Sequence, residues 1–358
     1  MRIRSCGSTP TRRCALFVLA SVALWYYLLM KHGTFMPLFV ITHTTAHQPS
    51  SFVADTTISA DWMPPAGQRV VVSFTTLPHH LDKLRETIES LKAQTFVPNA
   101  IYVNVPKGVN KRTGVAYSVP RYLREEKSVV VNRCKEYGPL TKLLPTLLRE
   151  KDPDTIVITL DDDKTYPEDA IRTLVWHSVK NKGSKVSVGL CGWAFISLPT
   201  ARGVTSVYVP WAMRGRHGRR VDVLQAVCGN AYRRGHFGAD DATLIRELGS
   251  PAKACYTTDD INIAGYLRAR SNVHAVIIPN ARHLEPTEPS WKAEEGSESV
   301  GFRLSSFNLD AFSDLKCMRA LDAQWKRNVF NSAQSRYPTR VAGTWGQDNS
   351  GGASINEQ

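Results

Sequence analysis

A short apolar run that ends in three aspartates constrains the fold of this chain more than any other feature. Residues 156–160 read Ile, Val, Ile, Thr and Leu, and five consecutive β-prone residues predict a buried strand. Asp161, Asp162 and Asp163 follow directly. Because open α/β sheets bind their ligands at the carboxyl ends of the strands, the sequence predicts a site at this point.

The aspartate cluster also predicts the kind of ligand. Three like charges behind a buried strand are unfavourable unless a cation offsets them. Asp161 and Asp163 are two residues apart, so at a bent strand end they can converge on Mn²⁺ or Mg²⁺ and leave positions for phosphate oxygens. The alternative is a solvated turn before a helix, with Pro167 and Glu168 in the first turn. Capping explains one or two acidic residues there but not three.

The N-terminus predicts a membrane anchor. Four arginines within residues 1–13 precede an apolar segment, 14–30, of about the minimum length that spans a bilayer. Arginines remain on the cytoplasmic side, so we expect a cytoplasmic tail, a signal-anchor and a lumenal remainder, in a Golgi or ER membrane if the source is eukaryotic. A cleaved signal peptide is the alternative, but residues 26–32 offer no small-x-small cleavage site.

The remaining chain divides by composition. Residues 31–68 are rich in Thr, His, Pro and Ser and predict a stem. Residues 69–330 predict the folded domain, and the polar, Gly- and Ser-rich residues 331–358 predict a disordered tail. With 358 residues, 42% of them apolar, the chain can bury one substantial core or two smaller ones.

Strand and helix patterns alternate through the folded domain. The expected strands are 70–74, 100–105, 129–131, 156–160, 185–190, 204–209 and 273–278. Leucines and isoleucine at helical spacing predict helices around 81–91 and 143–148, and another is expected from Asp259 to Arg268. This alternation predicts an α/β fold with a mostly parallel sheet flanked by helices.

Charge and cysteine content exclude some classes. The net charge is +13, and the one dense basic run, 213–220, has no interleaved aromatic residues, so nucleic acid is not an expected partner. Of seven cysteines, five follow the predicted anchor and none forms a Cys-x-x-Cys pair, so structural zinc is not expected. One or two lumenal disulfides with an odd thiol left over are compatible with this number.

Several segments taken together carry a resemblance to a known family. They are Val71–Pro78, Tyr137–Leu147, the Asp161 cluster, Gly229–Arg234 and Thr258–Ala264. In this order they resemble nucleotide-sugar-dependent glycosyltransferases of the GT-A fold, close to family 2-like enzymes and with features of exostosin-like transferase domains. The resemblance implies a Rossmann-like GT-A domain, a UDP- or GDP-sugar donor, and a glycan, glycoprotein or glycolipid acceptor.

The resemblance also implies site residues. The nucleotide-sugar would contact Thr75, Thr76, Leu77, Lys142, Asp161, Asp162, Gly229 and Asn230. An ordinary turn after the first strand and a surface lysine are the alternatives for the first four of these. Asp161 and Asp163 would form the Asp-x-Asp motif that holds the metal, with His283 as a candidate third ligand. A lone histidine is more often a surface or packing residue.

A second acidic pair, Asp259 and Asp260, opens the expected helix behind Thr257 and Thr258. The family places its catalytic carboxylate in such a pair, where it deprotonates the acceptor hydroxyl or assists on the same face of the sugar. We favour Asp260, with Asp259 as the alternative. Both residues could instead cap the helix, since acids are favourable at its positive end.

Two other functions fit part of the pattern. Asp161 to Thr165 also matches the Asp-x-Asp-x-Thr signature of haloacid-dehalogenase-like phosphohydrolases, although at least two strands precede it here. A catalytically silent GT-A domain that serves as a binding module is the second alternative.

Overall fold

The computed structural model describes residues 58–59, 61–111, 113–200, 203–209, 219–279, 281–294 and 311–326. All of them belong to the unit Ala46–Gln358. The predicted cytoplasmic tail, the signal-anchor, most of the stem and the C-terminal tail lie outside these residues. Within the described ranges, no helix has both the length and the apolar character needed to cross a bilayer.

Eight strands form the main sheet, in the order β3-β2-β1-β4-β10-β5-β11-β8. Neighbours pair in parallel from β3 to β4 and between β5 and β11, while β10 and β8 run antiparallel to their neighbours. The predicted α/β class with a mostly parallel sheet is therefore confirmed. The strands are β1 Val70–Thr75, β2 Ala100–Pro106, β3 Val129–Cys134, β4 Ile156–Thr159, β5 Val186–Gly189, β8 Arg219–Val221, β10 Asn230–Arg233 and β11 His274–Ile277.

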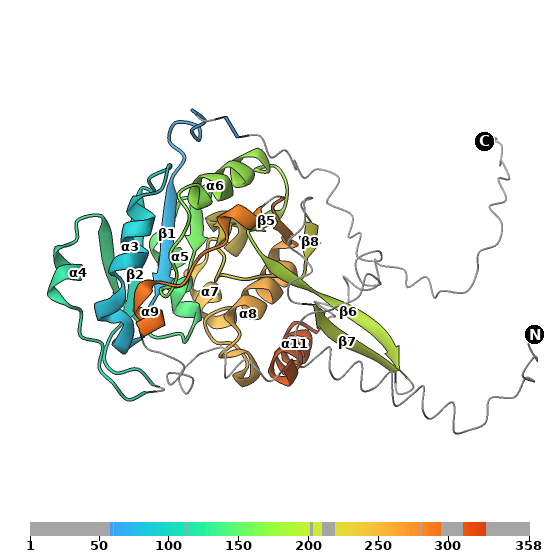
Figure 1. The fold of residues 1–358 in the computed structure, drawn as a ribbon. Helices are drawn as coiled ribbons and strands as arrows, with labels where there is room; N and C mark the ends of the chain where they lie inside the picture. Colours follow the sequence, from blue (N-terminus) through green and yellow to red (C-terminus); the bar gives the residue numbers. More distant parts are fainter. Residues whose placement is uncertain are drawn as a thin grey trace, which may run out of the picture. The chain divides into compact units, whose positions relative to one another are not determined.

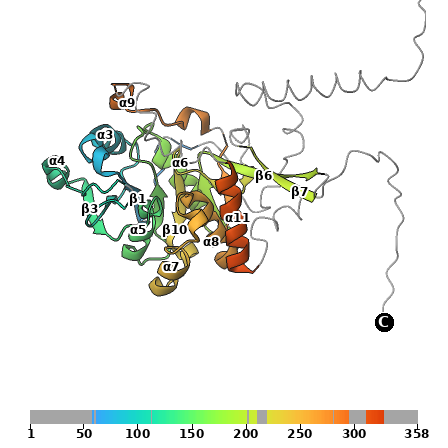
Figure 2. The same ribbon diagram turned by 90° about the horizontal axis from the view of Figure 1, so that it is seen from below.

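Helices cover both faces of this sheet. They are α3 Arg85–Lys92, α4 Arg121–Glu125, α5 Leu144–Arg149, α6 Ala170–Lys180, α7 Asp241–Glu247, α8 Asp259–Tyr266, α9 Ser290–Glu294 and α11 Ala311–Trp325. Short 3₁₀ helices are η1 Pro78–Lys83, η2 Leu140–Lys142, η3 Arg234–Phe237, η4 Lys253–Cys255 and η6 Ala281–Leu284, and a π-helical turn, η5 Leu267–Ser271, extends α8. Figures 1 and 2 show α3 and α6 on one side of the sheet and α5, α7 and α8 on the other.

The alternation of side chains along the strands explains these layers. In β1, Val70, Val72 and Phe74 pack into the core beneath α3 and α6, whereas Val71 packs into the core beneath α5, α7 and α8. Successive strand residues point to opposite faces, so a strand that is apolar at every position must be covered on both sides. The continuous apolar runs in the sequence therefore predict the two helical layers.

Strand β10 departs from the expected pattern. It was not among the expected strands, although the resemblance assigns Gly229 and Asn230 to the nucleotide-sugar, and Asn230–Arg233 form a buried strand between β4 and β5. Because β10 is antiparallel to both, its first residue lies opposite Thr159 of β4 and Gly189 of β5. The loop before β10 therefore reaches the edge at which β4 delivers its aspartates.

A three-stranded sheet lies beside the main one, formed by β6 Gly192–Thr200, β7 Gly203–Val209 and β9 Val223–Leu224. Only β7 matches an expected strand. Disulfides join Cys191 to Cys228 and Cys255 to Cys317, and Cys134 is a free thiol. Two disulfides and an odd thiol agree with the cysteine count after the predicted anchor.

Candidate active site

Lys142 is the residue that joins the two acidic motifs. It ends η2, and its carbonyl accepts hydrogen bonds from Ser73 on β1 and Asn104 on β2, which fix this turn against the sheet. The Lys142 Nζ donates to Asp161 Oδ1 at 2.7 Å and lies 3.3 Å from Asp259 Oδ2. Carboxylates almost a hundred residues apart in the sequence thus share one buried ammonium group.

The charge of Lys142 is maintained by this arrangement. Burial opposes the charged form, but the carboxylates of Asp161, Asp259 and Asp260 outweigh it and raise the pKa of Lys142 well above its ordinary value. The ammonium group is therefore a fixed positive charge at the site. The alternative of an ordinary surface lysine does not describe it, because its side chain is only 11% exposed.

Asp260 lies in the first turn of α8. Thr258 occupies the N-cap position and makes no side-chain capping bond, and both carboxylate oxygens of Asp260 lie 3.4 Å from the Ala226 N–H. Burial and the neighbouring charge of Asp259 raise the pKa of Asp260 well above that of a solvated aspartate. A raised pKa makes the ionised form of this group a stronger base than a solvated aspartate, which is how enzymes tune a carboxylate that takes part in proton transfer.

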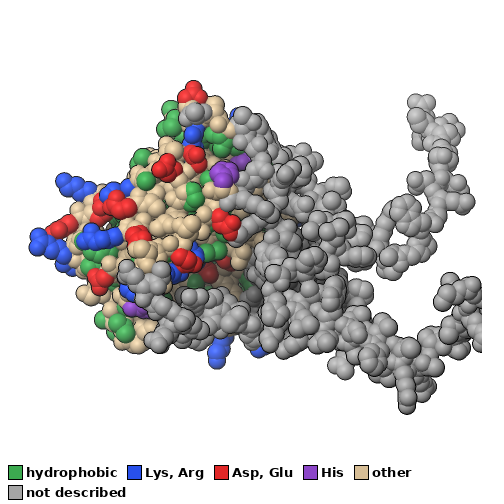
Figure 3. Space-filling view, viewed as in Figure 1, with side chains coloured by type: hydrophobic (Ala, Val, Ile, Leu, Met, Phe, Trp, Pro, Cys, Tyr) green, Lys and Arg blue, Asp and Glu red, His purple; other side chains and the backbone are tan. Residues whose placement is uncertain are grey.

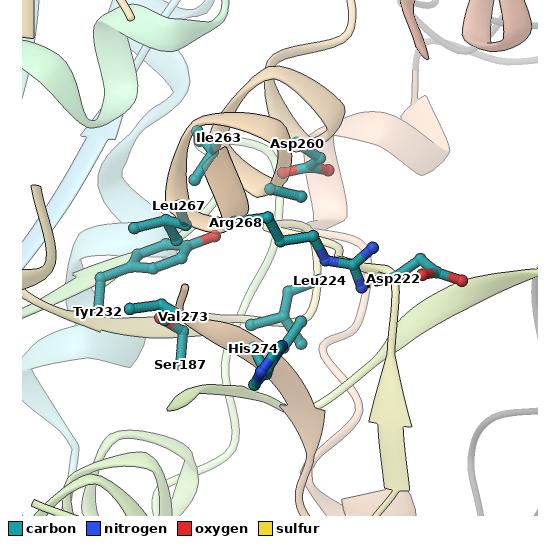
Figure 4. Close-up of a pocket in the computed structure, with 12 residues that line it drawn as sticks. Ser187, Asp222, Leu224, Tyr232, Asp260, Ile263, Leu267, Arg268, Val273 and His274 are labelled. Carbon is teal, nitrogen blue, oxygen red and sulfur yellow. Dashed lines mark ion pairs between the residues drawn. The ribbon is translucent and has the colours of Figure 1, made fainter. Parts of the chain in front are cut away.

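A pocket extends from Asp260 beneath α8. It is lined by apolar side chains of β9, α8 and η5, by Tyr232 of β10, and by the ion pair between Arg268 and Asp222 (2.9 Å). Figure 4 shows the Arg268 guanidinium directed toward Asp222, with Asp260 at the start of the helix above. Of the predicted site residues, Asp260 is the one that lines this pocket.

The three consecutive aspartates face different partners. Asp161 pairs with Lys142, as described above. Asp162 pairs with Nδ1 of His80 at 3.0 Å, and Thr87 donates to its backbone carbonyl at 2.9 Å. Although burial opposes it, the His80 contact holds the pKa of Asp162 below its usual value. Asp163 contacts the ammonium group of Lys292, which comes from α9.

The aspartates suit a divalent cation by their chemistry. Burial and the charges of Asp162 and Asp161 raise the pKa of Asp163, because this carboxylate lies close to two other negative groups. Asp161 and Asp163 each already accept a cationic group, Lys142 and Lys292 respectively. Hard carboxylate oxygens from one or two residues are what Mg²⁺ and Mn²⁺ use when phosphates supply other ligands. The donor set therefore fits such a cation.

The candidate third ligand is not placed with these two aspartates. His283 lies in η6 with its side chain exposed, and among the described side chains no three His, Cys, Asp or Glu groups gather closely enough to hold a metal ion. Its role as a ligand stays a prediction.

The loop after β1 lies next to the aspartates. Thr76 is buried and its hydroxyl helps to lower the pKa of Asp162, while the Thr75 hydroxyl donates to the Asn104 carbonyl at 2.8 Å. Leu77 has extended backbone and precedes η1. These residues border the site, and their contact with a nucleotide stays a prediction.

Gly229 and Asn230 have packing roles in this structure. Gly229 has φ +111°, and a Cβ there would lie 3.2 Å from Leu160 and 3.3 Å from Leu174. Asn230 is fully buried, and its amide, with the oxygen toward the Ala226 N–H and the nitrogen toward the Gln225 carbonyl (both 3.1 Å), holds the loop before β10. Both residues support the loop that contacts Asp260.

The sequence alone did not identify three residues that lie at the site, namely Tyr166, His80 and Lys292. The Tyr166 hydroxyl accepts from the Asp161 N–H at 2.9 Å and donates to the Val227 carbonyl at 3.3 Å, which links the aspartate turn to the loop before β10. His80 and Lys292 contact Asp162 and Asp163. The Tyr-Pro pair after the aspartates and the His-His pair after Pro78 were visible signals, whereas nothing near Lys292 in the sequence indicates its partner.

No family model and no curated protein sequence matches this chain. Among solved structures, the mannosyltransferase PcManGT from Pyrobaculum calidifontis, in complex with GDP-Man and Mn²⁺, is similar over 81% of this chain and 79% of that chain. The TM-score is 0.40 and the sequence identity is 14%.

Proposed function

We propose that this chain is a nucleotide-sugar-dependent glycosyltransferase that uses Mn²⁺ or Mg²⁺ at Asp161 and Asp163. The observation that carries the proposal is the buried Lys142 ammonium group between Asp161 and Asp259. It brings the two acidic motifs together at the carboxyl edge of a mostly parallel sheet, where such folds bind ligands. The proposal rests on this site and on the motif resemblance, not on the similarity to the solved structure.

Sugar transfer makes two demands that this site can meet. The reaction separates a nucleoside diphosphate from an oxocarbenium-like sugar carbon, so negative charge grows on the leaving group. The divalent cation would supply positive charge to that leaving group. Lys142 holds Asp161 in place, and its permanent charge adds to the positive potential at the same edge.

The acceptor hydroxyl must also lose its proton. Asp260 has a raised pKa and lies two residues past Thr258, at the N-terminus of α8. We assign it the role of the carboxylate that takes the proton or assists on the same face of the sugar, with Asp259 holding Lys142. The donor is a UDP- or GDP-sugar and the acceptor is a glycan, glycoprotein or glycolipid.

The test uses the purified full-length chain with a panel of UDP- and GDP-sugars, with and without Mn²⁺. Metal-dependent release of UDP or GDP is expected, and Asp163→Ala should abolish it. Asp82→Ala, an exposed acidic residue of η1, is the matched control and should retain release. Hydrolysis of a generic phosphoester without release from any nucleotide-sugar would favour the phosphohydrolase alternative. Binding without turnover would favour the silent module.

We further propose that the protein is a single-pass membrane protein with a lumenal catalytic domain, in the Golgi or ER membrane if the source is eukaryotic. The arginine-flanked apolar segment 14–30 motivates this topology.

A further inference from the structure

A segment of the C-terminal half crosses the edge of the sheet beside the aspartates. We name residues 285–292 the strap. Its backbone pairs with the residues that follow the aspartates, since Thr165 N–H donates to the Thr287 carbonyl at 2.9 Å and Thr287 N–H donates back at 3.0 Å. At the other end, Ser290 donates to the carboxylate of Glu86 on α3 through its N–H (2.8 Å) and hydroxyl (2.5 Å). The strap is therefore fastened on both sides of the aspartate turn.

Trp291 fixes the end of the strap against the loop after β1. Its ring lies 5.1 Å from the ring of His80, which in turn pairs with Asp162. The ammonium group of Lys83 lies 4.8 Å from the centre of the same indole ring, a favourable cation–π distance. These contacts determine where the next residue, Lys292, can reach.

Lys292 places its ammonium group on Asp163, the carboxylate proposed to hold the metal. It also lies 2.7 Å from Glu288 of the strap, which Lys164 contacts as well. The side chain of Lys292 is 26% exposed, so it faces a partly open site and is not locked in the core. Figure 3 shows positive and negative side chains interspersed over the face that carries α3 and α4.

We propose that Lys292 is a donor-binding residue whose ammonium group exchanges its contact with Asp163 for a contact with the diphosphate of the nucleotide-sugar. This inference rests on the proposed function. A divalent cation and an ammonium group repel each other and compete for the same carboxylate oxygen. If Asp163 held the cation, the ammonium group of Lys292 would remain beside this carboxylate, because the strap is fastened at Thr165 and Glu86. The diphosphate is then the anion within its reach, and lysine is a common phosphate ligand.

Calorimetry on the full-length chain tests the exchange with Mn²⁺ alone and with UDP and GDP in the presence of saturating Mn²⁺. In Lys292→Met the affinity for Mn²⁺ alone should rise by about threefold or more, because a competing cation is removed. The affinity for UDP or GDP should fall about tenfold or more, because a charge-assisted hydrogen bond to phosphate is lost. Lys292→Arg keeps the charge and should retain nucleotide binding.

Lys92→Met is the matched control, since the ammonium group of Lys92 at the end of α3 pairs with Glu89 (3.0 Å) and Glu126 (3.3 Å). It should leave both affinities within about twofold of the wild type. If Lys292→Met unfolds, Lys292→Gln replaces it, and a thermal melt verifies the fold of each variant.

The opposite signs of the two effects are the signature of the exchange. Equal losses of affinity for Mn²⁺ and for the nucleotide would mean that Lys292 has a structural role. Gains of affinity for both would mean that Lys292 competes with the cation but never contacts the diphosphate. Either result overturns the inference, as would unchanged affinity for both ligands. A wild-type chain that binds neither UDP nor GDP with Mn²⁺ would refute the proposed function itself. A wild-type chain that binds them, with an unaffected Lys292→Met variant, would refute the exchange alone.

Discussion

Replacing Lys142 with methionine removes the positive charge that Asp161 and Asp259 share and keeps a side chain of similar length. The two contacts are 2.7 and 3.3 Å long, and the lysine side chain is 11% exposed. Breaking a buried ion pair by removing one partner typically costs about 3–5 kcal/mol, because the remaining charge is left uncompensated. We expect Lys142→Met to lose about that much unfolding free energy, which corresponds to a Tm lowered by about 6–20 °C for a domain of this size.

The matched control is Lys182→Met. Lys182 also pairs with an aspartate, Asp154, at 2.8 Å, but both side chains are more than half exposed. Exposed pairs of this kind contribute about 0–1 kcal/mol, so this variant should change stability little. Urea unfolding followed by circular dichroism measures both variants under the same conditions.

A double variant tests whether uncompensated charge is the cause. Asp161→Asn in the Lys142→Met background removes one of the unpaired carboxylates and should restore part of the lost stability. Saturating Mn²⁺ should stabilise Lys142→Met more than the wild type, because a divalent cation offsets the same charges. A loss in Lys142→Met no larger than that in Lys182→Met would refute the view of Lys142 as the cation of this cluster.

Three further predictions concern other parts of the chain. Asp260→Asn should lower turnover by about 10²-fold or more while nucleotide binding persists, and a large loss in Asp259→Asn with near-normal Asp260→Asn would move the catalytic role one residue back. Burial lowers the pKa of His236 from its ordinary 6.5 to about 4, so the proton favours the unfolded state. The contribution of His236 to the free energy of unfolding should be constant above about pH 6.5 and fall by an amount on the order of 3 kcal/mol toward pH 4. Urea unfolding of His236→Gln at the same pH values should lack this decrease. In sealed vesicles the domain after residue 69 should resist added protease, and digestion from the cytoplasmic side would contradict the lumenal topology.

The elements that the sequence predicts well are those with local patterns. Strands β1, β2 and β4 are runs of mostly apolar residues, and their burial on both faces follows from that local pattern. The proximity of Asp161 and Asp259 also follows from motif order, since each ends or begins an element at the same sheet edge. Lys142, which lies between these two carboxylates in space, was assigned to the site only through the family resemblance, with a surface lysine as the alternative.

Strand β10 shows why other parts were missed. The strand begins with Asn230 and ends with Arg233, and Arg234 follows directly, so its sequence has the appearance of an exposed polar segment. Arg233 donates to the Ser178 carbonyl at 2.7 Å and Arg234 to the Leu147 carbonyl at 2.8 Å, so their burial depends on partners 55 and 87 residues away. Lys292 is 129 residues from Asp163. No local pattern encodes such pairings.

The order of the strands in the sheet has a consequence for the sequence of events during synthesis. β1 to β4 are parallel neighbours in one half of the sheet and are complete once residue 159 has been made. β5 pairs only with β10 and β11, which are translated later, so the second half must wait for them. Domains generally fold as units during synthesis, which proceeds at about 5–20 residues per second. A nascent chain halted before residue 259 contains the residues of β1 to β4 but lacks Asp259, Asp260 and β11, so we expect ribosome-bound chains of that length to be inert toward sugar donors.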